Sequence, residues 1–307
     1  MNTKNAFSVA QNKSKKNGSR NGKQRYKCHA CGRQFEGGKR LNPQELWQAY
    51  TAGKQTASQL AATFKCSSKT IYRHLKKAEP KAQFATPKHV NVIMDTTYFG
   101  RSFGIMVLMD SISGKALSVS KVKYETNELY AKAIGSLKAK GIAIQSIVCD
   151  GRRGLPQMFA DINIPVQLCQ FHQVKTISRY LTRNPKTEAG KALWRLVLTL
   201  KSSSQSDFEH NLKTWFEQYQ SYLNERTVNP ETGKSHYTHQ KLRSAYSSLK
   251  RNLDYLFVFE KYPDLNIPNT TNLLDGAFAG LKRHLACHQG MSKENKVRFI
   301  KDYFSIK

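Results

Sequence analysis

The chain has 307 residues, 39% of them hydrophobic, which is enough for one domain of ordinary size and a smaller second one. Its formal net charge of +29 attracts polyanions, so nucleic acid is the expected partner. No stretch approaches the roughly 18 apolar residues of a membrane span, and we therefore expect no membrane association. The polar, basic first residues lack the apolar core of a secretory signal, which favours a cytoplasmic protein associated with the nucleoid.

Positive charge is concentrated at the beginning of the chain. Residues 1–90 contain 19 Lys and Arg against 3 Asp and Glu, and 19 minus 3 gives a net of +16. Residues 1–40 are interpreted as a basic arm in which a short strand ends at a Cys28-x-x-Cys31 knuckle. The six cysteines are too scattered for a disulfide framework, and this pair alone has metal-ligand spacing.

Residues 41–78 are predicted to form a helix-turn-helix that binds DNA. Its short helices begin at Pro or after a hydroxyl residue suited to N-capping, and they are expected at 43–53, 56–64 and 67–77. The second helix of such a motif normally enters the major groove. The candidate DNA contacts lie near the start of the last helix and are Lys69, Thr70, Tyr72 and Arg73. Residues 79–89 contain two prolines and are interpreted as a linker.

Residues 90–307 are predicted to form a single α/β domain. Three β-rich runs at 89–100, 103–111 and 114–125 are followed in order by a helix at 126–141, a strand at 144–150, a helix at 154–162 and a strand at 166–172. This βββαβαβ order is that of an RNase H-like core. A helical insertion is expected at about 173–262, interrupted by a polar turn at 227–235, and the closing stretch 269–304 is expected to be helical.

Two aspartates mark the predicted chemistry of this domain. Asp95 follows the apolar run VNVIM and Asp150 follows IQSIVC, so each is expected where a buried strand leaves the core. Either one alone reads more simply as a turn residue. As a pair on neighbouring strands, joined by Asp275 from a later helix, they are suited to binding one or two Mg²⁺ ions that clamp the oxygens of an in-line phosphoryl transfer.

Several motifs of this chain, taken together, resemble a known family. They are RYKCHACGRQF, TASQLAATFKCSSKTIYRHL, MDTTYFG, VCDGRRGL, LCQFHQVKTISRYL and NTTNLLDGAFAGLKRHL, which span nearly the whole chain. In this order they are similar to bacterial insertion-sequence transposases of the Mutator-like superfamily, in the variant group with an N-terminal zinc ribbon. The resemblance implies that Asp95, Asp150 and Asp275 form a DDE triad that binds Mg²⁺ or Mn²⁺, and that the enzyme cuts and joins DNA at the ends of its element.

The chain departs from this family at two places. The family usually has Glu where this chain has Asp275, so the carboxylate is one methylene shorter. Related ribbons also have a first C-x-x-C knuckle, whereas no cysteine precedes Cys28 and structural zinc usually takes four ligands. We therefore interpret the ribbon as degenerate, with Cys28 and Cys31 as two remaining candidate ligands for Zn²⁺.

Three further features have two interpretations each. Cys169 and His172 match the family's C-x-x-H motif, in which the side chains hold a strand end near the active site, or they are a buried thiol and a hydrogen-bonded histidine. Arg152 and Arg153 contact a scissile phosphate or form a solvated basic turn. Trp194 and Trp215 stack on an extruded base or, more often for aromatics at helical spacing, belong to the core.

The sequence favours a transposase that binds the terminal repeats of its insertion sequence and catalyses metal-dependent DNA cleavage and strand transfer. Its partners would be the terminal repeats, target DNA and further copies of the chain, as a homodimer or higher oligomer in the synaptic complex. The alternative is a catalytically decayed transposase that acts as a DNA-binding protein or repressor. A general RNase H-like nuclease would explain the acids but not the basic arm.

Overall fold

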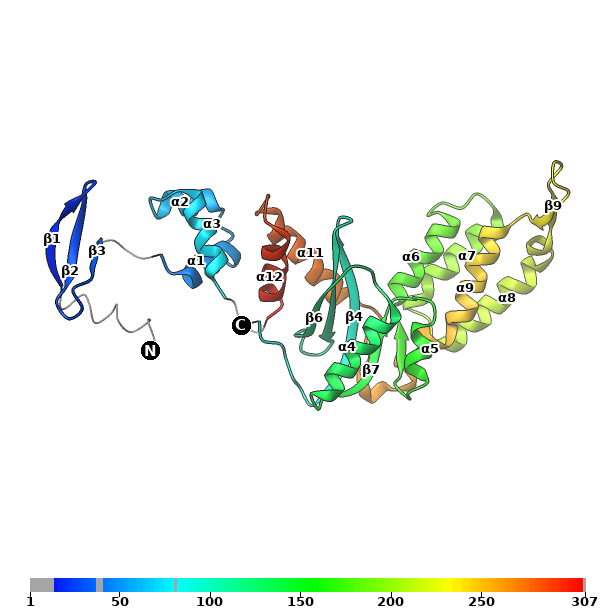
Figure 1. Cartoon of the computed structure of the whole chain (residues 1–307). Helices are drawn as coiled ribbons and strands as arrows, with labels where there is room; N and C mark the ends of the chain where they lie inside the picture. Colours follow the sequence, from blue (N-terminus) through cyan, green and yellow to red (C-terminus); the bar gives the residue numbers. More distant parts are fainter. Residues whose placement is uncertain (1–13, 37–40, 80–81, 306–307) are drawn as a thin grey trace. The chain divides into compact units, whose positions relative to one another are not determined.

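A computed structural model describes residues 14–36, 41–79 and 82–305 (Figure 1). The chain divides into two compact units, Met1–Glu79 and Pro80–Lys307. The second unit contains both the largest sheet and the helices that follow it in the chain. Among the described residues, no helix combines the length and the apolar character that crossing a membrane requires.

The first unit begins with a small antiparallel sheet of β1 (Ser14–Arg20), β2 (Lys23–Cys28) and β3 (Gln34–Glu36), in that order. Asn21 and Gly22 connect β1 to β2 with positive φ angles of 51° and 74°, and Arg20 pairs with Lys23. Two successive positive φ angles define a turn that follows the twist of the strands. The strand ending at Cys28 was predicted, but the hairpin before it was not.

Three short helices complete the first unit: α1 (Pro43–Thr51), α2 (Ala57–Thr63) and α3 (Ser68–Lys77). Thr56 and Gln59 form a reciprocal capping box at the start of α2, and the Ser67 hydroxyl accepts a hydrogen bond from the backbone N–H of Thr70. These caps explain why the helices begin where the sequence predicted. Their shared core is apolar and contains Leu46, Trp47, Tyr50, Leu60, Ile71 and Leu75.

The second unit is built on a five-stranded mixed sheet, which confirms the predicted α/β class. Its strands are β4 (His89–Phe99), β5 (Phe103–Asp110), β6 (Ala116–Val122), β7 (Ala143–Cys149) and β8 (Val166–Leu168), in the order β6-β5-β4-β7-β8. β5 is antiparallel to β4 and β6, whereas β4, β7 and β8 are parallel. The carboxyl ends of β4, β6, β7 and β8 therefore lie at one edge of the sheet.

Two helices connect the parallel strands. α4 (Asn127–Ala139) follows β6 and buries Tyr130, Ile134 and Leu137, while α5 (Leu155–Ala160) joins β7 to β8. Both pack on strands of the sheet. This strand and helix order is consistent with an RNase H-like core.

A helical segment follows β8. It contains α6 (Gln170–Leu181), α7 (Glu188–Leu198), η2 (Thr199–Lys201), α8 (Gln205–Asn224), α9 (Gln240–Leu256) and α10 (Val258–Lys261), with a hairpin of β9 (Arg226–Val228) and β10 (Ser235–Tyr237) before α9. Figure 1 shows α6, α7, α8 and α9 side by side, and each contacts its neighbours. Trp215 is buried and its Nε1 donates to the carbonyl of Ala189 at 3.0 Å, so this tryptophan belongs to the core rather than to a base-stacking surface.

Buried glutamines attach the helical segment to the sheet. Gln167 on β8 and Gln170 on α6 both donate to the carbonyl oxygen of Leu256 at the end of α9, at 2.8 and 3.0 Å. Gln167 also accepts a hydrogen bond from the backbone N–H of Phe259. Buried amides without partners are costly. These bonds therefore fix both ends of the helical segment beside the carboxyl end of β8.

The closing stretch 269–304, which was predicted to be helical, contains two separate helices. α11 (Asn272–Ala286) contacts β4 and buries Leu274, Phe278, Leu281 and Leu285. α12 (Lys293–Tyr303) starts anew after Ser292, whose hydroxyl caps it. Gly290, with a φ of 78°, lies in the intervening turn. Glu294, the alternative candidate for the third acid, is therefore in the first turn of a separate helix from the one that carries Asp275.

Candidate catalytic and DNA-binding site

Asp95 and Asp150 lie on neighbouring parallel strands, at the edge where their carboxyl ends meet. β4 pairs with β7 through Val92 and Ile147 and through Ile93 and Val148. Continuing this register by two residues places Asp95 beside Asp150. Asp95 does not end its strand as predicted, because β4 continues to Phe99 in a hairpin with β5. Asp95 lies instead just beyond the point where the pairing of β4 with β7 ends.

The carboxyl group of Asp95 is only partly exposed. Its Oδ1 accepts a hydrogen bond from the backbone N–H of Thr96 at 2.7 Å. Its pKa is raised to about 7, chiefly by burial and also by the negative charges of Asp150 and Asp275, against the opposing effects of the Thr96 bond and of His172. The four side chains are thus close enough to interact electrostatically. A cation would relieve the repulsion among the three carboxylates.

Asp275 reaches this cluster from the first turn of α11. The start of that helix is fixed by Thr271, whose hydroxyl contacts Asp275 Oδ2 at 3.3 Å and His172 Nδ1 at 3.4 Å. The backbone N–H of Thr271 donates to the thiol sulfur of Cys169 at 3.3 Å. Cys169 directly follows the short strand β8, so this contact ties the start of α11 to the edge of the sheet that carries Asp95 and Asp150.

Cys169 and His172 interact with each other as well as with Thr271. Burial raises the pKa of the Cys169 thiol, but hydrogen bonds from His172 and Thr271 outweigh it and leave the pKa below its ordinary value. The bond to Cys169 raises the pKa of His172 against the effect of burial, and the charges of Asp95 and Asp275 add to the increase. The structure thus brings the C-x-x-H motif to the aspartates, whose charges favour the protonated form of its imidazole.

Glu125 is a fourth acidic side chain at this edge, and sequence reasoning did not single it out. It follows β6, and its pKa is raised by burial and by the charge of Asp150, against the hydrogen bond from Tyr130 and the charge of Arg152. Tyr130 donates to Glu125 Oε1 at 2.7 Å and also contacts the Thr96 hydroxyl at 3.0 Å. Glu125 therefore links the surroundings of Asp95 to those of Asp150. Its position at the end of the predicted run 114–125 was visible in the sequence, whereas its nearness to Asp150 was not.

Arg152 and Arg153 follow Asp150 but differ in their contacts. The Arg152 backbone N–H donates to Asp150 Oδ1 at 3.3 Å, its Nε donates to Asn127 Oδ1 at 2.7 Å, and its guanidinium lies 3.9 Å from Glu125. Its side chain is thus held by α4. The side chain of Arg153 is exposed and forms no ion pair with an acidic residue in the described part of the chain.

The donor set at the sheet edge is chemically suited to a hard cation. Asp95, Asp150 and Asp275 offer carboxylate oxygens, the ligands that Mg²⁺ and Mn²⁺ favour. Within the residues that the structure describes, no three His, Cys, Asp or Glu side chains are close enough together to hold one metal ion. The aspartates thus interact electrostatically without converging on one point.

In the first unit, the knuckle cysteines and the proposed DNA-reading residues occupy defined positions. Cys28 is buried at the end of β2 and Cys31 is exposed, and no third metal ligand joins them among the described residues. On α3, Lys69, Tyr72 and Arg73 are exposed on one face. The Thr70 hydroxyl instead contacts Ser67 Oγ at 3.1 Å, within the helix cap.

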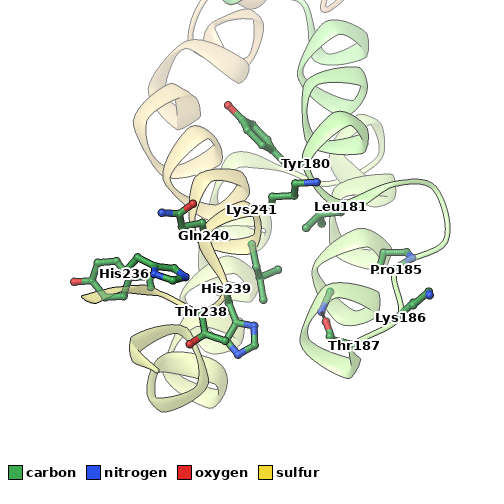
Figure 2. Close-up of a pocket in the computed structure, with 13 residues that line it drawn as sticks. Tyr180, Leu181, Pro185, Lys186, Thr187, His236, Thr238, His239, Gln240 and Lys241 are labelled. Atoms are coloured by element: carbon green, nitrogen blue, oxygen red, sulfur yellow. Dashed lines mark hydrogen bonds between the residues drawn. The ribbon is translucent and has the colours of Figure 1, made fainter. Parts of the chain in front are cut away.

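A cavity of about 440 Å³ lies within the helical segment, where the end of α6, the start of α7, β10 and the start of α9 meet (Figure 2). Lys186 and Thr187 line one side, and His236 and His239 line the other. His239 bonds Glu225 at 2.9 Å and stacks on Tyr222. None of the site residues predicted from the sequence lines this cavity, so it is separate from the cluster of aspartates.

Comparisons with known proteins find only distant similarity. No family profile matches the chain, and no curated protein sequence matches it. The fold is similar to a Drosophila P element transposase in a strand transfer complex, with a TM-score of 0.37, 11% identity and coverage of 87% of this chain and 92% of that one. It is also similar to a chain of a simian T-cell lymphotropic virus intasome in complex with the PP2A regulatory subunit B56 gamma, with a TM-score of 0.23, 15% identity and coverage of 64% and 73%. These similarities are too weak to assign a family.

Proposed function

We propose that the chain is a DDE-type DNA transposase, which binds the terminal repeats of its insertion sequence and catalyses strand cleavage and strand transfer. The observation that carries the proposal is the parallel pairing of β4 with β7, which sets Asp95 beside Asp150 at the edge that Asp275 approaches from α11. An RNase H-like core with a helical insertion after its last strand accounts for the sheet order and for the helices that follow β8.

The aspartates and His172 have different roles in the proposed reaction. Asp95, Asp150 and Asp275 would hold the Mg²⁺ or Mn²⁺, which supplies charge stabilisation to the attacking and leaving oxygens of the phosphoryl transfer. His172, held by Cys169 and Thr271, lies beside the aspartates with its protonated form favoured by their charges, and its contact with Thr271 helps to fix the start of α11. Water attacks the phosphodiester at the end of the element and releases its 3′-hydroxyl. That hydroxyl then attacks a phosphodiester of the target DNA, and the bond to the 3′-oxygen of the target strand breaks, which leaves a free 3′-hydroxyl there. A homodimer or higher oligomer would bring two ends together.

The proposal is tested by a strand-cleavage assay on DNA that carries the sequences flanking the coding region of the element, with Mg²⁺ and with Mn²⁺. We expect metal-dependent cuts at the repeat ends that are absent from a duplex of shuffled sequence. Binding to the repeat ends without cleavage under either metal would instead favour the decayed transposase that acts as a repressor. The observation that motivates this second function is Asp275 in place of a longer acid.

The first unit is expected to supply end recognition. Residues 1–79 contain 17 Lys and Arg against 3 Asp and Glu, and 17 minus 3 gives a net of +14, while Lys69, Tyr72 and Arg73 share an exposed face of α3. Arg73→Ala should weaken binding to the repeat ends and flatten the slope of log affinity against log salt by about 0.9, the effect of one lost phosphate contact. A chain beginning at Lys81 should lose discrimination between repeat ends and random duplex altogether. Unchanged discrimination by that shorter chain, measured by competition binding, would contradict this assignment.

Glu125 is expected to act as a positioning residue for cleavage. Glu125→Gln keeps an acceptor for Tyr130 but removes the charge that faces Arg152. Because Arg152 in turn donates its N–H to Asp150, we expect cleavage to fall by about 10- to 100-fold, the usual loss when a group that supports a metal ligand is changed. The apparent affinity for Mn²⁺ in the cleavage assay should fall with the rate. A purely structural role would lower the melting temperature without changing that affinity.

A further inference from the structure

A cleft of about 570 Å³ opens directly beside the proposed catalytic edge, between the loop after β7 and the helix α9 of the helical segment. The loop contributes Gly151, Arg152, Arg153 and Gly154, and α9 contributes Arg251 and Asn252. Gly151 lies next to Asn252, whose Nδ2 is 3.7 Å from the position that a Cβ atom would occupy at this glycine. Two segments that are 100 residues apart in the chain thus form one cleft that begins next to Asp150.

The charges that line this cleft are all positive. Its lining contains the three arginines Arg152, Arg153 and Arg251, together with glycine, proline and amide side chains, and no Asp or Glu. Arg152 faces Glu125, but Arg153 and Arg251 form no ion pair with an acidic side chain in the described part of the chain. Like charges gathered in a cleft repel one another and focus a positive potential there. The arrangement therefore favours an anion that the protein itself does not provide.

The framework around the cleft is rigid. Asn252 donates to Gln173 Oε1 on α6 at 2.9 Å, and Asn127 donates to the carbonyl oxygen of Arg153 at 3.0 Å. Next to Asn252, Leu253 and Leu249 are buried in the core. The backbone of the loop at Arg153 and of α9 beside Arg251 is thus held in place. Guanidinium groups bind phosphate oxygens through paired hydrogen bonds, and fixed positions preserve that geometry.

We propose that this cleft binds the sugar-phosphate backbone of duplex DNA adjacent to the bond that is cut, and that Arg251 of the helical segment contacts a phosphate from the side opposite Arg153. The inference rests on the proposed function, since it is the nearness of Asp150 that makes the bound backbone the substrate strand. The helical segment then contributes directly to substrate binding, and it does so through a residue that none of the sequence motifs marked.

The test measures binding of the full chain to a random-sequence duplex of about 30 base pairs, roughly three helical turns. Its dissociation constant is followed by fluorescence anisotropy in Mg²⁺ buffer between about 50 and 200 mM salt, where phosphate contacts control the affinity. Arg251→Ala and Arg153→Ala should each flatten the slope of log affinity against log salt by about 0.9, and the double variant by about 1.8. Arg251→Lys, which keeps the charge, should retain the wild-type slope.

Lys250→Ala is the matched control, because Lys250 is exposed, precedes Arg251 on α9 and does not line the cleft. It should retain the wild-type slope, and thermal melting should show all variants equally folded. A wild-type slope for Arg251→Ala, or equal flattening by Lys250→Ala, would overturn the proposal. If the wild-type chain cleaves DNA but Arg251→Ala leaves the slope of log affinity against log salt unchanged, the proposal for the cleft is wrong while the proposed function stands. Flattening by Arg251→Ala without cleavage by wild type would support the cleft and count against the transposase.

Discussion

Asparagine in place of Asp95 or Asp150 is expected to abolish strand cleavage while leaving the fold and DNA binding intact. A divalent cation provides several kcal/mol of charge stabilisation in phosphoryl transfer, and about 1.4 kcal/mol corresponds to a tenfold change in rate. A carboxamide keeps the shape of the side chain but not the charge that holds the cation. We therefore expect a loss of at least ~100-fold in either variant, measured as the initial rate of cutting on repeat-end DNA with Mg²⁺.

Stability should move in the opposite direction from activity in Asp95→Asn. Burial raises the pKa of Asp95 to about 7, so its carboxylate is disfavoured in the folded protein. A group with a raised folded pKa stabilises the fold below its unfolded value of 3.8, and this contribution is lost as the pH rises through about 7. In metal-free buffer above that pH, the asparagine variant should melt no lower than the wild type.

Asp110 provides a matched control, because it is a strand-end aspartate of the ordinary structural kind. It ends β5, which runs in the opposite direction, and its carboxylate accepts a hydrogen bond from the Ser113 hydroxyl at 2.6 Å in the following turn. Asp110→Asn should lower the stability by about 1 kcal/mol and leave the cleavage rate of the remaining folded protein unchanged. Cleavage by Asp95→Asn at the level of Asp110→Asn would show that Asp95 is a turn residue too.

The sequence predicted which strands carry the acids because a buried strand has a clear signature. The runs before Asp95 and Asp150 are mostly apolar, interrupted only by Asn91 in the first and by Gln145 and Ser146 in the second, as expected for strands covered on both faces. The extent of β4 was also predicted, as the run 89–100, but the place of Asp95 inside the strand was not, because the polar residues Thr96 and Thr97 follow the apolar run while still pairing with β5. Cross-strand pairing, rather than the residues of β4 themselves, keeps that segment extended.

The hydrogen-bond network around the acids was beyond sequence reasoning. The contacts of Thr271 with Cys169 and His172 join residues about 100 positions apart. Glu125 stood at the end of a predicted strand, but its relation to Asp150 depends on the direction in which β6 runs in the sheet. Such relations follow from the strand order, which one sequence does not specify.

Two local signals were present but were not used. Asn21-Gly22 is a strong hairpin signal, and it produces the turn between β1 and β2. Gly290 followed by Ser292 marks the end of one helix and the cap of the next, and the structure separates α11 from α12 there. The second omission matters for the site, because it removes Glu294 from the helix that carries Asp275.

We expect Asp275 to determine whether the proposed enzyme is active or catalytically decayed. Its contacts in the structure allow a specific prediction of how substitutions there change the cleavage rate. Its backbone N–H bonds the carbonyl oxygen of Thr271, and its Oδ2 lies 3.3 Å from the Thr271 hydroxyl, so the position from which the carboxylate extends is fixed. A fixed backbone with a short side chain leaves the carboxylate about one bond length from where Glu would place it. A misplacement of about 1 Å can cost about a hundredfold in rate.

We therefore expect weak cleavage by the wild-type chain, stronger with Mn²⁺ than with Mg²⁺ because Mn²⁺ is less strict about ligand geometry, and a gain in Asp275→Glu. The measurement is a parallel cleavage assay of wild type, Asp275→Glu and Asp275→Ala on repeat-end DNA. Glu294→Gln serves as the control, since Glu294 lies on α12 and should not affect the rate. Equal rates for wild type and Asp275→Ala would show that Asp275 is not a ligand. If only the Asp275→Glu variant cleaves, the geometry of the site is intact and the wild-type chain lost its activity because Asp is one methylene shorter than Glu.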